Sequence, residues 1–260
     1  MIERLRSSTV LWATVGALAL GLFWEAFVRL RDVREFVLLP PSEIVATFAE
    51  TPGFYLDNIW VTGQRLAIGL VVSLTIALVV GALLAAFRPL EQASQPLLVL
   101  ILVTPWVAYI SSIVLWVGRG TPSILFLVVF VTVPAFVYAT VGGMRGADPA
   151  ARELFASVDA SRWEVLWRLR LPSAMPSLFT AARFNVGLGL AAAYFAEGAA
   201  LSSNGLGEAG KRAAALNEGS ILWTTILCTA VLGIGSQAVV ALAERWLLHW
   251  HASQRRAATR

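Results

Sequence analysis

Six long apolar runs constrain the fold of this chain more than any other feature. They cover residues 10–28, 66–87, 96–118, 121–144, 173–196 and 219–243. Each run holds 19 to 25 residues and at most one charged residue. A helix needs about 20 apolar residues, at about 1.5 Å rise each, to cross the hydrocarbon core of a bilayer. The runs therefore predict an all-α integral membrane protein with six transmembrane helices, arranged as one domain over residues 1–260.

Composition supports this class of protein. Hydrophobic residues make up 58% of the chain and charged residues only 14%, whereas soluble domains carry about 25% charged residues. The runs lack the polar alternation of a membrane β-barrel. Of the 20 basic residues 19 are arginines, and the net charge is +4. In a membrane protein this excess indicates basic loops facing anionic lipid, so we expect the bilayer and not nucleic acid as a partner.

The arginines between the runs predict the orientation. With both termini in the cytoplasm, 12 basic residues fall in inner segments and 7 in outer segments. This bias agrees with the positive-inside rule. The first run is not followed by a convincing cleavage site, so we interpret it as an uncleaved first helix.

Two stretches interrupt the apolar pattern. The first contains Leu39-Pro40-Pro41-Ser42, and residues 43–50 after it predict a short surface helix capped by Ser42. The second covers residues 145–172 and holds nine of the 36 charged residues.

Capping signals divide the second stretch into two helices. Asp148 followed by Pro149 forms an N-cap and N1 pair, which predicts the start of a first helix. Ser161 and Glu164 fit a capping box, which predicts the start of a second. We expect Pro172 to end the second helix at the preceding residue.

The two short helices must meet at a corner over residues 158–160. Phe155, Val158 and Trp163 are then exposed on a highly charged loop. Exposed apolar groups are typical of a docking surface, although tryptophan is also common at the lipid interface. The residues alone leave both interpretations open.

The second stretch contains Glu153, Asp159 six residues later, and then Leu169-Arg170-Leu171-Pro172. This pattern resembles the EAA loop of binding-protein-dependent ABC importer permeases. Further motifs resemble the nitrate/sulfonate/taurine branch of that family over about residues 39–250. They are Leu39-Pro40-Pro41-Ser42, Trp116-Val117-Gly118, Ala160-Ser161-Arg162-Trp163, Leu171-Pro172 with Pro176, Arg183, Ala196-Glu197 and Gly205-Leu206-Gly207. The resemblance implies the type I ABC importer permease (MetI-like) fold.

The sequence departs from the family pattern at several positions. Phe155 replaces the second alanine and Asp159 replaces the glycine, while Ser111-Ser112 stands where the family often has Pro-Leu. Aspartate enters the left-handed αL conformation at lower cost than most residues, so the corner can persist.

The resemblance also implies partners and a location. The expected assembly contains a second permease copy or homologue, two ATP-binding subunits that hold ATP and Mg²⁺, and an extracytoplasmic solute-binding protein in a bacterial inner membrane. The chain itself would hold no cofactor. The expected solute is a small anion such as nitrate, a sulfonate or taurine, or a nutrient precursor. The residues expected to contact the ATPase are Glu153, Phe155, Ser157, Asp159, Ala160, Trp163, Leu171 and Pro172.

Several polar and aromatic residues within or beside the runs are candidates for a solute pathway. Arg183 lies ten residues into its run, about 15 Å deep by helix rise, and an intramembrane charge is by default a functional hypothesis. Its alternative is a structural bond to a neighbouring helix. Glu197 directly follows the same run. We expect it to snorkel to water at the outer surface, and the alternative is a position near an outer gate. The other candidates are Trp106, Tyr109, Ser111 and Asn185, and the alternative for them is a role in joining helices.

Two glycine patterns resemble nucleotide-binding motifs. Residues 205–210 match G-x-G-x-x-G, and Gly210-Lys211 fits a phosphate loop whose Ser/Thr position holds Arg212. Neither pattern follows a predicted strand, so we interpret the glycines as a tight turn and expect no ATP hydrolysis by this chain alone. His249 and His251 have no cluster of ligands nearby, so no metal site is predicted.

Two other functions compete with a permease. An intramembrane lipid-modifying enzyme would need converging carboxylates, histidines or a nucleophile, and the runs supply only Glu25, Arg183 and the nearby Glu197. A passive channel would leave the doubly capped, charged loop unexplained.

Overall fold

The computed structural model is helical throughout the part of the chain that it describes, residues 2–249, apart from short connections. Side chains of residues 2–10, 13, 200 and 201 lie outside the description, as do His251 and the three arginines of the C-terminal tail. The longer helices are α1 (Ile2–Leu30), α3 (Pro52–Ala86), α4 (Arg88–Val103), α6 (Thr121–Arg145), α9 (Leu171–Ala196) and α11 (Gly219–Leu247). The shorter ones are α2 (Pro41–Glu50), η1 (Trp106–Tyr109), α5 (Ile110–Val117), α7 (Pro149–Ser157), α8 (Arg162–Val165), η2 (Leu166–Arg170), η3 (Glu197–Leu201) and α10 (Leu206–Leu216).

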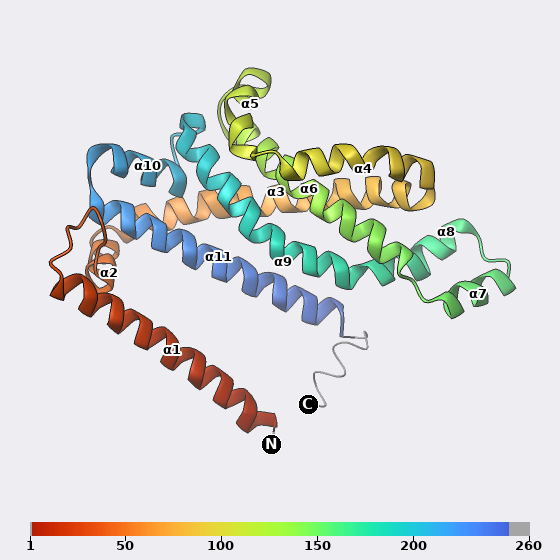
Figure 1. Ribbon diagram of the computed structural model, residues 1–260, viewed down its shortest axis with the longest axis horizontal. Helices are drawn as coiled ribbons and strands as arrows, with labels where there is room; N and C mark the ends of the chain where they lie inside the picture. The colour runs from red at the N-terminus through yellow and green to blue at the C-terminus, as the bar shows by residue number, and fades with distance from the viewer. Residues whose placement is uncertain (1, 250–260) are drawn as a thin grey trace.

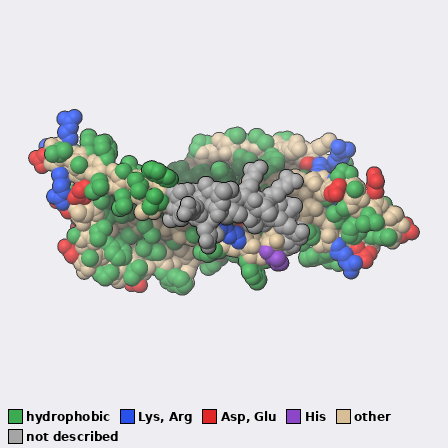
Figure 2. Space-filling view, turned by 90° about the horizontal axis from the view of Figure 1, so that it is seen from below, with side chains coloured by type: hydrophobic (Ala, Val, Ile, Leu, Met, Phe, Trp, Pro, Cys, Tyr) green, Lys and Arg blue, Asp and Glu red, His purple; other side chains and the backbone are tan. Residues whose placement is uncertain are grey.

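The long helices run along the long axis of the molecule, and the short ones gather mainly at its ends (Figure 1). We call the end that carries α7 and α8 the loop end, and the opposite end, with α2 and α10, the cap end. On the face seen in Figure 2, charged side chains lie mostly at these two ends, and apolar side chains are visible between them beside the grey region. This distribution suits a bundle whose long axis crosses the membrane.

Small residues allow α3 and α6 to pack closely at the centre of the bundle. Val128 of α6 lies against one α3 glycine and Thr140 against another, where a Cβ atom would clash. Between them the hydroxyls of Ser73 and Thr132 are 2.6 Å apart. Among the buried residues of α3, the small ones recur every fourth position and are Gly69, Ser73, Ala77 and Gly81. Such a line of small residues is typical of helix pairs in membranes.

The helix α9 packs against both α6 and α3, because its Gly189 lies against Val128 and Leu66. Gly143 lies directly against Ala174, and the Ser177 hydroxyl donates to the Ala139 carbonyl at 2.9 Å. The three helices α3, α6 and α9 therefore form the core, and α1 stands apart from it over most of its length (Figure 1).

Among the described residues, four helices are long and apolar enough to cross a membrane: Pro52–Ala86, Thr121–Arg145, Arg162–Ala199 and Gly219–Leu247. A fifth span results if the bent pair Arg88–Val103 and Trp106–Val117 counts as one. The helix α1 corresponds to the first predicted run, but its first side chains lie outside the description. The multi-pass fold is thus established, while the count of six spans and the orientation stay predictions.

The expected span over residues 96–118 is interrupted in the structure. The chain bends by 91° between α4 and the helices that follow it. Pro105 lacks an N–H and disfavours helical backbone at the residue before it, and Thr104 is extended with ψ of 131°. By contrast, α6 runs without interruption through Pro134.

The prediction that Pro172 ends a helix is wrong. Helix α8, the π-helical segment η2 and α9 form one helical stretch over Arg162–Ala199. In the π register the Leu171 N–H donates to the Leu166 carbonyl, and the Ser173 hydroxyl donates to the Leu169 carbonyl at 2.7 Å. These bonds satisfy backbone groups near the proline, so the helix continues past it.

The helix α2 forms where predicted, but Ser42 does not cap it. Pro40 occupies the N-cap position and no side chain caps the helix. The Ser42 hydroxyl and N–H instead donate to the Glu25 carboxylate of α1 at 2.7 and 3.0 Å. Arg29 also donates to Glu25, at 2.5 Å, so a polar clamp joins α1 to α2.

Candidate functional site

The loop end carries the first candidate site, and both of its helices begin where their caps predict. The Asp148 carboxylate accepts the Ala150 N–H at 3.0 Å. The Ser161 hydroxyl accepts the Glu164 N–H at 3.2 Å, and the Glu164 carboxylate accepts the Ser161 N–H at 3.0 Å. Each cap satisfies backbone donors that a helix start leaves open, which makes both starts rigid.

The corner between α7 and α8 is formed by Asp159. This residue has φ of +48°, in the left-handed region. The N–H of Asp159 donates to the Ala156 carbonyl at 3.2 Å and that of Ala160 to the Phe155 carbonyl at 3.0 Å, closing the end of α7. Aspartate thus adopts the conformation for which the related motif uses glycine.

Apolar side chains project from this loop. Leu154, Val158 and Trp163 have exposed fractions of 63%, 67% and 67%. Trp163 and Trp167 pack edge to face at 5.6 Å. Among the residues predicted to contact a partner, Glu153, Ser157, Asp159 and Trp163 are exposed, and Phe155, Ala160, Leu171 and Pro172 are half-buried. The loop therefore presents an apolar ridge bordered by charge.

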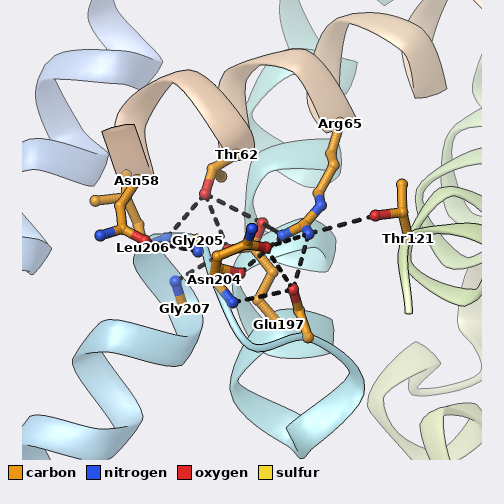
Figure 3. A network of polar contacts seen from close by, with 10 residues as sticks. Asn58, Thr62, Arg65, Thr121, Glu197, Asn204, Gly205, Leu206 and Gly207 are labelled. Carbon is orange, nitrogen blue, oxygen red and sulfur yellow. Dashed lines mark hydrogen bonds and ion pairs between the residues drawn. The ribbon is translucent and has the colours of Figure 1, made fainter. Parts of the chain in front are cut away.

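The cap end holds a second constellation, a buried polar cluster centred on Glu197 (Figure 3). The Glu197 side chain has no exposed surface. Its carboxylate accepts from Arg65 at 2.7 Å, from the Thr62 hydroxyl at 2.9 Å and from the Gly207 N–H at 3.0 Å. The expectation that Glu197 reaches outer water is therefore wrong, because these donors hold the carboxylate inside the fold.

The guanidinium of Arg65 ties the loop before α10 to the bundle. It donates to the Asn204 side chain at 2.7 Å and the Asn204 carbonyl at 2.9 Å. It also donates to the Ser202 hydroxyl at 2.8 Å. Arg65 thus binds the loop as well as Glu197, and nearly all of its donors have partners.

One face of α3 supplies the cluster. Asn58, Thr62 and Arg65 follow at helical spacing, so their side chains share a face. The side-chain amide oxygen of Asn58 accepts the Gly205 N–H at 2.7 Å, and the Thr62 hydroxyl accepts the Leu206 N–H at 2.9 Å. Sequence reasoning missed this cluster. The available signal was the helical spacing of Asn58, Thr62 and Arg65 just before an apolar run. Their hydrogen-bond partners, such as Glu197 and Gly205, lie 132 to 147 residues away along the chain.

The same cluster explains the glycine motif. Gly205 has φ of +110°, and a Cβ there would meet the Glu197 carboxylate. A Cβ on Gly207 would meet the Tyr194 carbonyl, and one on Gly210 the Tyr194 hydroxyl. The glycines permit a positive φ and close backbone approach in a buried turn, without the strand that a nucleotide-binding loop would follow.

Arg183 and Asn185 join helices in this structure. Arg183 forms an ion pair with Glu244 of α11, and its carbonyl accepts from Gln237 at 2.6 Å. The Asn185 side chain is fully buried and donates to the Thr132 carbonyl at 3.0 Å. These contacts correspond to the structural alternative stated for such residues.

The aromatic candidates line the bend after α4. Trp106 packs edge to face on Phe195 at 5.6 Å, and Tyr109 on Phe130 at 5.2 Å. Ser111 is exposed on α5. The structure therefore brings Trp106 and Tyr109 to α9 and α6, but it does not gather all six pathway candidates at one place.

Comparisons with known proteins agree with this architecture. The family described as "Binding-protein-dependent transport system inner membrane component" matches residues 59–249. The formylaminopyrimidine transport permease protein ThiX of Halalkalibacterium halodurans is 29% identical over 96% of this chain and 99% of that protein. The taurine transport system permease protein TauC of Escherichia coli is 23% identical, over 96% of each chain. The riboflavin transport system permease protein RibX of Chloroflexus aurantiacus is 29% identical over 93% and 92%.

Solved structures show the same fold. An inward-facing structure of the MetNI methionine ABC transporter matches with a TM-score of 0.64 at 16% identity, covering 75% of this chain and 97% of that one. An amino acid ABC transporter matches with a TM-score of 0.62 at 11% identity, covering 77% and 97%.

Proposed function

The chain belongs to the family of binding-protein-dependent transport system inner membrane components, and on this premise we propose how it couples transport to ATP. It is the permease subunit of an ABC importer. In the proposal, the α7–α8 loop seats in a cleft of a cytoplasmic ATPase. The contact residues are Glu153, Phe155, Ser157, Asp159, Ala160 and Trp163, with Leu171 and Pro172 behind them.

One observation carries this proposal: an exposed apolar ridge stands on two capped helices that meet at a fixed corner. Leu154, Val158 and Trp163 are each more than 60% exposed, although they belong to a highly charged segment of the chain. Apolar groups in such a setting indicate a surface that a partner covers. The caps at Asp148 and Ser161 fix where α7 and α8 begin, so the two helices present this surface in a defined geometry.

The helical continuity of α8 and α9 provides the link to the membrane. When two ATPases close on ATP, two such loops would approach each other. Because α8 runs through η2 into α9, the movement reaches a core helix directly. The bundle of this chain and that of a second copy or a homologue would then alternate between inward and outward openings.

Chemistry takes place elsewhere in the assembly. ATP and Mg²⁺ bind to the ATPase partners, and an external binding protein delivers the solute. In this proposal the chain lies in a bacterial inner membrane with both termini in the cytoplasm, as the distribution of arginines favours.

The relatives support a small nutrient as the solute. Their names point to formylaminopyrimidine, taurine and riboflavin. These compounds share small size but differ in charge. The proposed solute is therefore a small anion such as nitrate, a sulfonate or taurine, or a nutrient precursor.

A charge reversal at the loop tests the coupling role. Glu153→Arg should reduce co-purification of the ATPase and solute-dependent ATP hydrolysis at least tenfold, because the exposed carboxylate lies beside the apolar ridge. Glu218→Arg, exposed at the cap end, is the matched control and should assemble normally. Full assembly and transport by Glu153→Arg would refute the proposal.

A second pair of variants tests the corner. Asp159→Gly keeps the left-handed conformation accessible, whereas the β-branched side chain in Asp159→Val opposes it. We expect ATPase binding to persist in the glycine variant and to fall in the valine variant. Equal binding by both would show that the corner does not position the contact.

A further inference from the structure

Four arginines converge on one hollow at the loop end. The hollow has a volume of about 470 Å³, and its remaining walls are residues 85, 86 and 144. Arg88 begins α4 and Arg145 ends α6, while Arg152 lies on α7 and Arg170 on η2. Four separate elements therefore each bring a guanidinium to the same place.

The positive charge of this hollow is only partly balanced. Glu91 forms an ion pair with Arg145. The Arg152 guanidinium donates to the Arg145 carbonyl, which is neutral. No ion pair forms at Arg88 or Arg170 among the residues that the structure describes. Four guanidiniums and one carboxylate leave a net charge of +3.

Such a group of cations is costly without an anion, because like charges around a shared hollow repel one another. Arginine presents several N–H donors in a planar fork that matches the oxygens of a phosphate group. We propose that Arg88, Arg145, Arg152 and Arg170 form a binding site for an anionic phosphate group, supplied by a phospholipid headgroup.

The position of the hollow favours lipid as the source. It lies where α3 ends, α4 begins and α6 ends, at the boundary between the apolar helices and the charged loop. Basic pockets between membrane helices at this level bind anionic headgroups. A second hollow of about 670 Å³ adjoins it, sharing Ala86 and Arg170, and is lined in part by Phe87, Trp163 and Leu166. These apolar walls suit the glycerol and upper acyl carbons of the same lipid.

The bound phosphate connects the loop to the bundle. Arg152 and Arg170 lie on either side of the α7–α8 corner, and Arg88 and Arg145 belong to the membrane helices. One anion that contacts all four therefore holds the loop in place. The four arginines are not among the proposed ATPase contacts, whereas the adjoining hollow shares Ala160 and Trp163 with them. The test uses the chain without its ATPase, so its outcome does not depend on that contact.

The experiment measures lipid binding by the purified full chain in detergent with native mass spectrometry. Phosphatidylglycerol, phosphatidylcholine or inorganic phosphate is titrated against the chain and against Arg88→Gln/Arg170→Gln. We expect phosphatidylglycerol to bind at least tenfold more tightly than phosphatidylcholine, and the double variant to lose at least tenfold in that affinity. Arg168→Gln, which is exposed on η2 outside both hollows, is the matched control and should change affinity less than twofold.

The phosphate arm separates the two sources of the ligand. Binding of phosphatidylglycerol without binding of 10 mM inorganic phosphate supports a headgroup site. Binding of inorganic phosphate that depends on Arg88 and Arg170 supports the phosphate chemistry and overturns the lipid source. Equal losses in the double variant and in Arg168→Gln, or no difference between the two lipids, overturn the site altogether.

Discussion

The loop end and the cap end of this permease are built from opposite kinds of contact. At the loop end, the helix caps of Asp148 and Ser161 join residues two or three positions apart, and apolar side chains face outward. At the cap end, the bonds from α3 to Glu197 and to the loop before α10 join residues more than 130 positions apart, and the Glu197 carboxylate is fully buried. The difference suggests that the loop end is organised for an external partner and the cap end for internal stability.

This difference also explains what could be predicted from the sequence. The starts of α7 and α8 follow from Asp148-Pro149 and from the Ser161 and Glu164 capping box, because each signal is complete within a few residues. The runs that became α6 and α11 were likewise located correctly at their starts. The pairing of Arg65 with Glu197 could not be seen, because nothing near either residue identifies the other.

The largest effect should come from breaking the buried ion pair. Glu197→Leu leaves the Arg65 charge buried and unpaired, which costs about 3–5 kcal/mol in the free energy of unfolding. Reversible unfolding in mixed micelles would measure this loss. The same substitution at the exposed Glu153 should change the free energy by less than about 0.5 kcal/mol.

A double variant separates charge burial from packing. In Glu197→Leu/Arg65→Met no buried charge is left, so we expect much of the lost stability to return. No recovery would mean that the hydrogen bonds from Arg65 to Asn204 and Ser202 matter more than the charge itself.

A smaller effect is expected at the glycines. Gly207→Ala places a Cβ against the Tyr194 carbonyl, and such overpacking costs about 1–3 kcal/mol. Gly235→Ala on α11 meets nothing within 4 Å and should stabilise the helix by up to about 1 kcal/mol. Thermal unfolding of the two variants should therefore shift in opposite directions, and a shared direction would contradict the packing argument.

At the loop end, removing a cap should act locally. Ser161→Ala deletes the acceptor of the Glu164 N–H, which costs about 1 kcal/mol of helix stability. Hydrogen exchange should show faster opening of α8 and unchanged protection of α10. Faster exchange at both ends would show that the two regions are coupled.

The smallest effect should occur at the ion pair between Arg183 and Glu244. Half of the Arg183 side chain is exposed, and polar contacts between membrane helices average about 0.6 kcal/mol. Arg183→Gln should therefore lower stability by about this amount. If transport then falls while assembly and stability persist, Arg183 serves the solute pathway instead.

Two prolines have different outcomes in this structure. The chain bends by 91° at Pro105, whereas Pro172 lies in a continuous helical stretch. Near Pro172, the Leu171 N–H donates to the Leu166 carbonyl and the Ser173 hydroxyl donates to the Leu169 carbonyl. A proline in the sequence therefore does not by itself predict whether a helix bends or continues.

The π-helical segment η2 has a mechanical consequence. It places one extra residue in a turn, and one residue corresponds to about 100° of rotation around a helix axis. The faces of α8 and α9 are therefore offset in phase along a single rod. If η2 adopted α-helical geometry, this phase offset would disappear and α9 would rotate about its axis relative to α8. The five-residue π segment would then convert a displacement of the loop into a rotation of a core helix.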